Sequence, residues 1–309
     1  MPCYYPMQGY PALTKNANGK NPIAFTRPAG YTGESIEIPC GRCIGCRLER
    51  SRQWALRCMH EAQCHDDNMF ITLTYAPENI PEYGTLKLEH WQKFMKRYRK
   101  MFTGTEIRFF MCGEYGENLE HSKNEKLGHP HYHACIFGHS FTDKLLHSNR
   151  DGTKLYKSAT LAKLWPFGFS TIGDVTFESA AYTARYVLKK QMGRNALEHY
   201  EYTDPSTGEI INLKPEFTTM SRRPGIGKTW YDKYKNDLTK DFITARGVKM
   251  KPPKYYDSQL EIEDELAYEK IKEQRRTSAM KHEKPDKYRR LEDGNKIKEK
   301  KLKNLVRNL

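Results

Sequence analysis

Residues 128–137 read Gly-His-Pro-His-Tyr-His-Ala-Cys-Ile-Phe, and the part from His131 to Phe137 is predicted to be a β-strand. Because residues two apart in a strand share a face, His131 and His133 project together while Tyr132 points to the opposite face. Two imidazoles on one side of a rigid strand form half of a divalent-metal site. Taken alone, such a pair is more typical of an ordinary surface strand that carries histidines.

The segments around this strand alternate between strand-like and helical patterns. Further strands are predicted, from their β-branched and aromatic residues, at 69–75, 106–113 and 169–177. Helices are predicted at 47–65, 86–102, 159–164 and 179–192, with Ser179 as the N-cap of the last one. Residues 1–39, and those of 138–165 that precede the short helix, are expected to be irregular. We therefore predict the α+β class, with a central antiparallel sheet of about five strands and flanking helices.

The composition favours a polyanionic partner. The 309 residues include 52 Lys and Arg against 38 Asp and Glu, a formal net charge of +14, together with 20 Tyr, 13 Phe and 4 Trp. Cations mixed with aromatic rings suit single-stranded DNA, although an anionic membrane surface or no such partner remain alternatives. No apolar run reaches the length of a membrane span, and the first residues lack the pattern of a signal peptide. The protein is therefore expected inside a cell and away from membranes.

A third ligand for the histidine pair is expected from a neighbouring strand. Glu114 ends the strand predicted at 106–113, which we expect to lie beside the histidine strand as its antiparallel neighbour. Glu117 is a weaker alternative, and either carboxylate could instead belong to a solvated loop. Two imidazoles and one carboxylate with open positions suit Mg²⁺ or Mn²⁺, and the imidazoles favour Mn²⁺.

A second group of reactive residues lies on the helix predicted at 179–192. Tyr182 and Tyr186 are four residues apart, so both phenols fall on one helix face, and Lys189 and Lys190 follow within a turn. A nearby cation favours the phenolate, which is the nucleophilic form of tyrosine. The alternative is that the tyrosines pack and the lysines are solvated.

Three cysteines, Cys40, Cys43 and Cys46, have the spacing C-x2-C-x2-C. They predict a structural zinc site with Cys3 as the fourth ligand. Reduced thiols near a turn are the alternative, because ordinary zinc fingers show two separated pairs of ligands.

Taken together, these motifs resemble a known family. The pattern of His131, Tyr132 and His133, followed about fifty residues later by Tyr182 and Tyr186, is similar to the HUH replication initiators. Additional segments resemble the two-tyrosine initiators of gokushovirus-type microviruses. These segments are CGRCIGCRLER (40–50), FITLTY (70–75), CGEYG (112–116) and MSRRPGIG (220–227).

This resemblance implies a fold and residue roles. The fold would be a ferredoxin- or RRM-like palm, with FITLTY as its central strand. His131 and His133 would hold the metal, and Glu114 would occupy the place of a variable third ligand. Tyr182 and Tyr186 would be the nucleophiles, with Lys189 or Lys190 steadying a phenolate or phosphate. His129 stands where Arg is expected in this family, so it would either add to the metal site or contact DNA.

The implied activity is rolling-circle replication in the host cytoplasm. One tyrosine would attack the origin phosphate of single-stranded DNA, giving a 5′-phosphotyrosine and a free 3′-OH that primes a host polymerase. The second tyrosine would then cleave the regenerated site, and rejoining would need no nucleotide cofactor. A non-catalytic single-strand-binding or packaging protein, and an HUH transposase or relaxase, remain alternatives.

Residues 224–229 (PGIGKT) look like part of a P-loop. The pattern needs a glycine where Arg222 stands, so we predict no ATP binding, and unwinding would come from a host helicase. Residues expected to contact DNA are His129, Arg185, Arg222, Arg223 and Lys228. Three domains are expected: a Cys-containing extension and helix (1–65), an HUH nicking domain (66–235) and a basic, charged tail (236–309).

Overall fold

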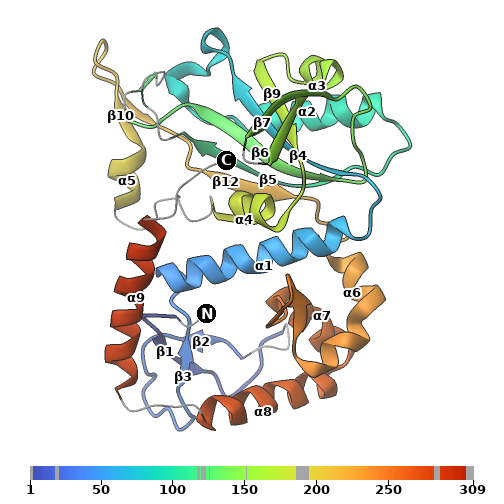
Figure 1. Cartoon of the computed structure of the whole chain (residues 1–309). Coiled ribbons are helices and arrows are strands. Elements are labelled where there is room, and N and C mark those ends of the chain that lie inside the picture. Colours follow the sequence, from blue (N-terminus) through green and yellow to red (C-terminus); the bar gives the residue numbers. More distant parts are fainter. Residues whose placement is uncertain are drawn as a thin grey trace. The chain divides into compact units, whose positions relative to one another are not determined.

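The computed structural model of the chain (Figure 1) describes residues 3–17, 21–116, 119, 123–124, 126–150, 152–185, 195–281 and 286–303. The chain forms two compact units. Unit 1 comprises Met1–Arg50 and Lys272–Leu309, and unit 2 comprises Ser51–Ile271. In the part of the chain that the structure describes, no helix is both long enough and apolar enough to cross a membrane.

Unit 2 is built on a seven-stranded sheet with the order β12-β5-β6-β4-β9-β8-β7. Its strands are β4 (Asn68–Tyr75), β5 (Arg108–Tyr115), β6 (Pro130–Phe137), β7 (Leu145–Arg150), β8 (Thr153–Lys157), β9 (Gly168–Gly173) and β12 (Phe217–Met220). Every neighbouring pair is antiparallel. The predicted α+β class is therefore confirmed, with a sheet wider than the five or so strands expected.

Helices cover both faces of this sheet. On one face α2 (Leu88–Met101) and α3 (Ala159–Leu164) pack over a core that includes Trp91, Leu161 and Tyr132. On the other face α4 (Phe177–Arg185) and the residues of α1 (Ile44–Ala62) from Ser51 onward bury a second core. Figure 1 shows α2 and α3 on the side of the sheet opposite to α4. The alternation along β6 thus sends Tyr132 into one core and the histidines toward the face of α4.

Burial differs between the strands of the main sheet. All eight residues of β5 are buried, whereas the residues of β4 alternate between buried and partly buried. Two short segments outside the main sheet also pair: β10 (Glu201–Thr203) with β11 (Ile210–Asn212), and β13 (Ile243–Ala245) with β14 (Val248–Met250). The main sheet therefore supplies the rigid frame of unit 2.

The start of α4 differs from the prediction. The strand expected to run to Phe177 ends at Gly173, and the helix begins at Phe177 rather than after Ser179. Thr176 Oγ1 accepts a hydrogen bond from the Ser179 amide (3.1 Å), and Ser179 Oγ accepts one from the Thr176 amide (2.8 Å). This reciprocal pair is a capping box in which Thr176 is the N-cap, so Ser179 caps from the third helical position.

Two segments expected to be irregular contain strands. Residues 145–150 and 153–157 pair as β7 and β8, and Gly152 (φ +81°), just before β8, takes the left-handed conformation. In unit 1, β1 (Met7–Pro11) pairs with β2 (Ile23–Ala24) and with β3 (Ile36–Ile38). These strands are short and largely exposed, so they lack the alternating apolar pattern that marks a half-buried strand.

The remaining elements are mostly helical. They are η1 (Pro77–Asn79), η2 (Glu82–Gly84), α5 (Asn195–Tyr200), α6 (Lys228–Tyr234), η4 (Lys235–Lys240), α7 (Lys254–Glu263), α8 (Glu265–Lys281) and α9 (Lys287–Lys303). A third core within unit 2 joins α1, α6 and α7 through Leu56, Tyr231 and Tyr256, all buried. Residues beyond 236 thus contribute to the packed interior of unit 2.

Candidate active site

The register of the central strands brings the predicted ligands together. β6 lies between β5 and β4, with Glu114 of β5 directly opposite His131. On the other side, Thr72 of β4 is opposite His133. Ligand atoms of Glu114, His131 and His133 all lie within 4.8 Å of one another. The antiparallel pairing expected between these strands is confirmed, and it places three potential metal ligands on one face.

Both imidazoles point the same nitrogen at one carboxylate oxygen. His131 Nε2 is 2.6 Å from Glu114 Oε1, and His133 Nε2 is 3.1 Å from the same atom. The two imidazole rings are nearly perpendicular, with centroids 4.9 Å apart. Glu114 is 1% exposed and His133 is 7% exposed, whereas His131 is partly exposed, so the cluster is largely buried but reaches the surface at His131.

The hydrogen bonds at the Nδ1 atoms of the imidazoles leave the Nε2 atoms available to a divalent cation. His131 Nδ1 is 2.9 Å from the His129 carbonyl, which can only accept, so Nδ1 carries a proton and a neutral ring has its lone pair on Nε2. That lone pair and a carboxylate oxygen repel each other at 2.6 Å unless a cation or a proton lies between them. Two imidazole nitrogens and a carboxylate that converge on one point fit Mn²⁺ or Mg²⁺.

The carboxylate of Glu114 stays ionised despite its burial. Burial by itself raises the pKa of a carboxylic acid, because the charged form loses its hydration. When the imidazoles are protonated, their hydrogen bonds and charges outweigh that effect and hold the pKa of Glu114 below its ordinary value. A metal cation in place of those protons would stabilise the ionised carboxylate in the same way.

Tyr182 lies against this cluster. Its ring centroid is 5.1 Å from that of His133, and the two rings are nearly perpendicular (86°). Residues on either side fix the helix that carries it: Ala180 and Ala184 are fully buried, and Ser51 Oγ donates a hydrogen bond to the Ala181 carbonyl (3.0 Å). The sheet and α4 thus bring a tyrosine and three metal-ligand candidates into one site.

Several residues singled out in the sequence fall outside the description. Tyr186, Lys189 and Lys190, expected on the same helix, lie outside the described residues, as does Glu117, the alternative ligand. Arg185 ends α4, and its side chain is likewise outside the description. Their predicted roles in catalysis and DNA binding stay predictions.

His129 holds the His131 imidazole in place through its backbone carbonyl. Its Nε2 is 2.9 Å from the carbonyl of Tyr75, to which it donates, and its own carbonyl accepts from His131 Nδ1. His129 is not among the three residues whose ligand atoms converge. The additional histidine therefore orients the His131 imidazole rather than joining the group of ligands.

Two residues at the site were missed by the sequence reasoning. Thr72 Oγ1 is 2.9 Å from His133 Nδ1 and so fixes the ring whose Nε2 faces Glu114. Phe70 stacks on the same imidazole, with ring centroids 5.6 Å apart and planes 14° apart. The period of two in the FITLTY strand places Phe70 and Thr72 on one face, which was the available signal.

Arg222 and Arg223 line a surface pocket of about 720 Å³ together with Arg99 and Arg108. Arg108 is engaged by the buried Glu61, and Arg99 donates to the Ile107 carbonyl (3.0 Å), whereas Arg222 and Arg223 are exposed. The pocket lies at the start of β5, and Glu114 lies six residues further on. At the rise of an antiparallel strand the two places are about 20 Å apart.

Lys228 is held by carboxylates. Its ammonium group forms an ion pair with Asp232 and lies 3.6 Å from Glu263. Together these partners outweigh the effect of burial and raise the pKa of Lys228. The ammonium group of Lys228 thus already interacts with two carboxylates of the protein, which weakens its attraction for a DNA phosphate.

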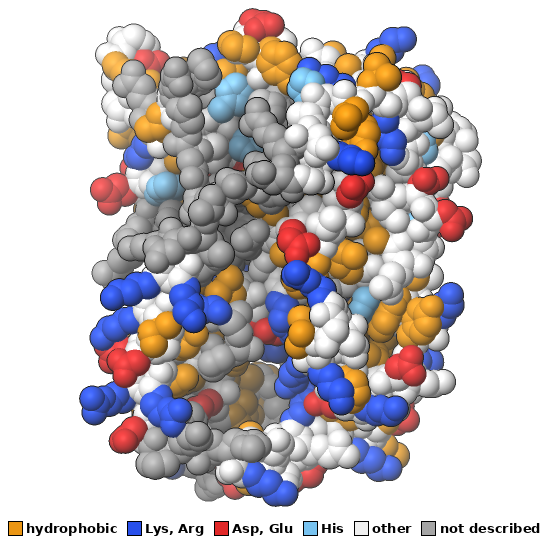
Figure 2. Space-filling model, viewed as in Figure 1, with side chains coloured by type: hydrophobic (Ala, Val, Ile, Leu, Met, Phe, Trp, Pro, Cys, Tyr) orange, Lys and Arg blue, Asp and Glu red, His pale blue; other side chains and the backbone are white. Residues whose placement is uncertain are grey.

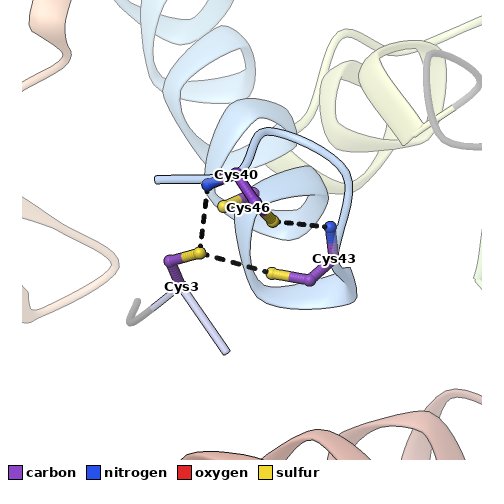
Figure 3. Close-up of side chains that lie close together, drawn as sticks. All are labelled: Cys3, Cys40, Cys43 and Cys46. Atoms are coloured by element: carbon purple, nitrogen blue, oxygen red, sulfur yellow. Dashed lines mark hydrogen bonds between the residues drawn. The ribbon is translucent and has the colours of Figure 1, made fainter. Parts of the chain in front are cut away.

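The four cysteines of the predicted zinc site also come together. In unit 1, Cys3, Cys40, Cys43 and Cys46 have their sulfur atoms within 4.8 Å of one another (Figure 3). All eight cysteines of the chain are free thiols.

Positive charge is spread over the surface. On the face drawn in Figure 2, Lys and Arg side chains are distributed among Asp and Glu rather than gathered into one patch. The net charge of +14 is consistent with a nucleic-acid partner but does not by itself locate the path of a DNA strand.

Comparison with known proteins identifies relatives. A family model described as replication-associated protein ORF2/G2P matches residues 68–191, which include the histidine pair and Tyr182. Replication-associated protein ORF2 of Spiroplasma virus 4 is 34% identical over 256 residues, covering 77% of this chain and 72% of that protein. Replication-associated protein VP4 of Bdellovibrio phage phiMH2K is 32% identical over 232 residues, covering 72% and 67%. None of the solved structures matches the chain.

Proposed function

The chain belongs to the replication-associated proteins of gokushovirus-type microviruses, and from this premise we propose that it initiates rolling-circle replication by nicking and rejoining single-stranded DNA through tyrosine attack. The observation that carries the proposal is the position of Tyr182, whose ring lies 5.1 Å from that of His133. A nucleophile and a set of metal ligands then share one site. A protein that only binds DNA has no need of this combination.

The residues of the site have different roles in the proposed reaction. Glu114, His131 and His133 would hold Mn²⁺ or Mg²⁺, and such an ion, when bound, polarises the scissile phosphate. The His129 carbonyl keeps His131 in the tautomer that offers Nε2, and the Thr72 hydroxyl holds the orientation of the His133 ring. Phe70 stacks on the His133 ring, and α4 presents Tyr182 beside the same ring. These residues orient one phosphate in front of one phenol.

The proposed reaction is a transesterification. The Tyr182 oxygen gives up its proton to solvent and attacks phosphorus, the bond from phosphorus to the 3′-oxygen breaks, and the released 3′-oxygen takes up a proton. The products are a 5′-phosphotyrosine and a free 3′-OH. In the reverse sense, a 3′-OH attacks the phosphotyrosine and releases the tyrosine, so joining conserves the phosphodiester bond and uses no nucleotide.

Tyr186 is proposed as the second nucleophile, with Lys189 or Lys190 stabilising the phenolate or the phosphate. Spacing of four residues places Tyr186 on the same side of a continuous helix as Tyr182. Two phenols that face one phosphate can alternate between successive rounds. The free 3′-OH would prime a host polymerase, and a host helicase would unwind the template in the cytoplasm of the host.

A cleavage assay tests the proposal. Origin single strands labelled at the 3′ end are incubated with the full chain and Mn²⁺, and products are separated under denaturing conditions. We expect a covalent protein–DNA adduct that disappears when Tyr182→Phe and Tyr186→Phe are combined. Tyr156→Phe, on the distant strand β8, is the matched control and should leave the adduct unchanged. Binding without any adduct in the unaltered chain, or an adduct that persists in the double variant, would contradict the proposal.

A further inference from the structure

The four cysteines of unit 1 come from two stretches nearly forty residues apart. Cys3 precedes the strand β1, and Cys40, Cys43 and Cys46 surround the first turn of α1. Figure 3 shows the Cys3 side chain reaching toward the other three from its own segment. Such convergence from distant segments distinguishes the group from thiols that are neighbours only because they share a turn.

Distances between the sulfur atoms suit a single metal ion. Cys3 Sγ and Cys43 Sγ are 3.9 Å apart, and all four sulfurs lie within 4.8 Å of one another. A tetrahedral zinc ion with Zn–S bonds of about 2.3 Å requires S···S separations of about 3.8 Å. The C-x2-C-x2-C spacing also occurs in iron–sulfur proteins, but sulfurs this close leave no room for a four-iron cluster.

Backbone amides are directed at the sulfurs. The amide of Cys40 donates to Cys3 Sγ (3.2 Å), that of Cys43 donates to Cys40 Sγ (3.3 Å), and that of Tyr4 donates to Cys43 Sγ (3.3 Å). Hydrogen bonds of this kind are stronger when the acceptor is charged. They would stabilise the thiolates that a metal requires and fix the orientation of each ligand.

Unit 1 also lacks what normally holds a small domain together. Among its described residues, no hydrophobic side chain is buried. Its strands β1, β2 and β3 are two to five residues long. A domain with so little core usually depends on disulfides or a structural metal, and the cysteines here are free.

We propose that Cys3, Cys40, Cys43 and Cys46 bind one zinc ion that holds unit 1 together. Four thiolates make a closed tetrahedral site, which is the arrangement of structural rather than catalytic zinc. The zinc would join the start of the chain to the beginning of α1. This inference does not depend on the nicking reaction.

Metal content tests the proposal in the full chain. The variant His131→Gln with His133→Gln removes the other metal-ligand candidates, so any ion that remains reports on the cysteines. We expect a single zinc ion per chain by mass spectrometry of metals. In the same protein, replacement of zinc by Co²⁺ should give the intense absorption of thiolate-bound tetrahedral cobalt. Iron with acid-labile sulfide, or absence of metal together with loss of free thiols, would overturn the proposal.

Single substitutions sharpen the test. Cys43→Ser should remove the zinc and make unit 1 sensitive to protease, because its segments lose their link. Cys64→Ser is the matched control, because Cys64 is also partly buried but lies outside the cluster. The zinc content of this variant should equal that of the unaltered chain. Retention of a full complement of zinc by both Cys43→Ser and Cys40→Ser would refute the assignment. The cobalt spectrum of the chain with all its cysteines decides the question if the variants fail to fold.

Discussion

The two groups of metal-ligand candidates differ in what supports them. Glu114, His131 and His133 stand on adjacent strands of a seven-stranded sheet with a packed core on each face. The four cysteines stand on short segments of a unit with no buried hydrophobic side chain among its described residues. The sheet of unit 2 positions its ligands without help from an ion. Unit 1 has little besides its four cysteines to hold its segments together.

This difference separates a site for chemistry from a site for stability. A group of three ligands leaves coordination positions open for a phosphate, whereas four thiolates fill a tetrahedron. Removal of the histidines should therefore cost activity and spare the fold. Removal of the cysteines should instead release unit 1.

The largest expected effect is that of His131→Gln combined with His133→Gln. Glutamine keeps an N–H donor toward Glu114, so the buried carboxylate retains partners, but it is a poor metal ligand. The loss of phosphate polarisation, worth several kcal/mol, should lower the rate of adduct formation by at least about 1,000-fold. Single-turnover cleavage of labelled DNA measures this effect.

Circular dichroism and zinc content of the same variant should be unchanged. His147→Gln, on the exposed edge strand β7, is the matched control for replacing a histidine. A double variant that unfolds or loses its zinc would show that the two sites are not independent, and the contrast between them would fail.

Thr72→Val tests whether the sheet aims its ligands. The hydroxyl of Thr72 fixes the His133 ring through Nδ1, and loss of such a partner typically lowers metal affinity or activity about 10- to 100-fold. The fall should be partly restored by raising the Mn²⁺ concentration. Thr74→Val is the matched control, because Thr74 shares the strand and the face, and the structure gives its hydroxyl no bond to either imidazole. Equal effects of the two variants would rule out the positioning role.

The sequence predicted the elements that are long and amphipathic. The strands β4, β5 and β6 were found from their β-branched and aromatic residues, and the helices α1 and α2 from an apolar pattern with the helical period. The β7–β8 hairpin was missed, since its residues are mostly exposed and their spacing carries no such signal. The N-cap of α4 was wrongly assigned to Ser179, because Thr176 and Ser179 accept from each other's amides and residue type alone does not show which of them begins the helix.

The part of the site that lies on consecutive strands could be predicted from the sequence. Glu114 and the histidines come from strands that follow each other along the chain, so their pairing could be inferred. The partner of His133 could not, because Thr72 lies some sixty residues away and meets it only through the register of β4 with β6. That register is set by packing on both faces of the sheet rather than by any local pattern.

A buried histidine tests how far the core of unit 2 supports its fold. His60 is 5% exposed, stacks on Trp230 and bonds to Tyr256, and burial lowers its pKa from 6.5 to about 4. Below pH 6.5 His60 takes up a proton in the unfolded chain but stays neutral in the folded chain until about pH 4. The free energy of unfolding therefore falls as the pH falls. At pH 5 the loss from this group should be about 2 kcal/mol.

Urea unfolding at several pH values measures this loss. His60→Phe keeps a stacked ring but does not titrate, so its stability should decline less steeply between pH 7 and pH 5 than that of the unaltered chain. Equal slopes for the two proteins would show that His60 is not held neutral by the core.

The smallest expected effect concerns the arginines of the surface pocket. Arg222 and Arg223 are exposed and lie about 20 Å along β5 from Glu114, so they would contact backbone phosphates away from the cleavage point. Each lost contact should lower the slope of log affinity against log salt concentration by about 0.7 for single-stranded DNA. Fluorescence anisotropy of Arg222→Ala and Arg223→Ala across a salt series measures the slope.

The reacting groups are untouched in these arginine variants, so cleavage at saturating protein should stay at its full rate. Lys163→Ala, an exposed cation on α3 across the sheet from α4, is the matched control and should leave the slope unchanged. An unchanged slope in both arginine variants would exclude the pocket from the DNA path. A loss of the cleavage rate itself would mean instead that this end of β5 acts on the site at the other end, because phosphate contacts that only anchor the strand do not alter the chemical step.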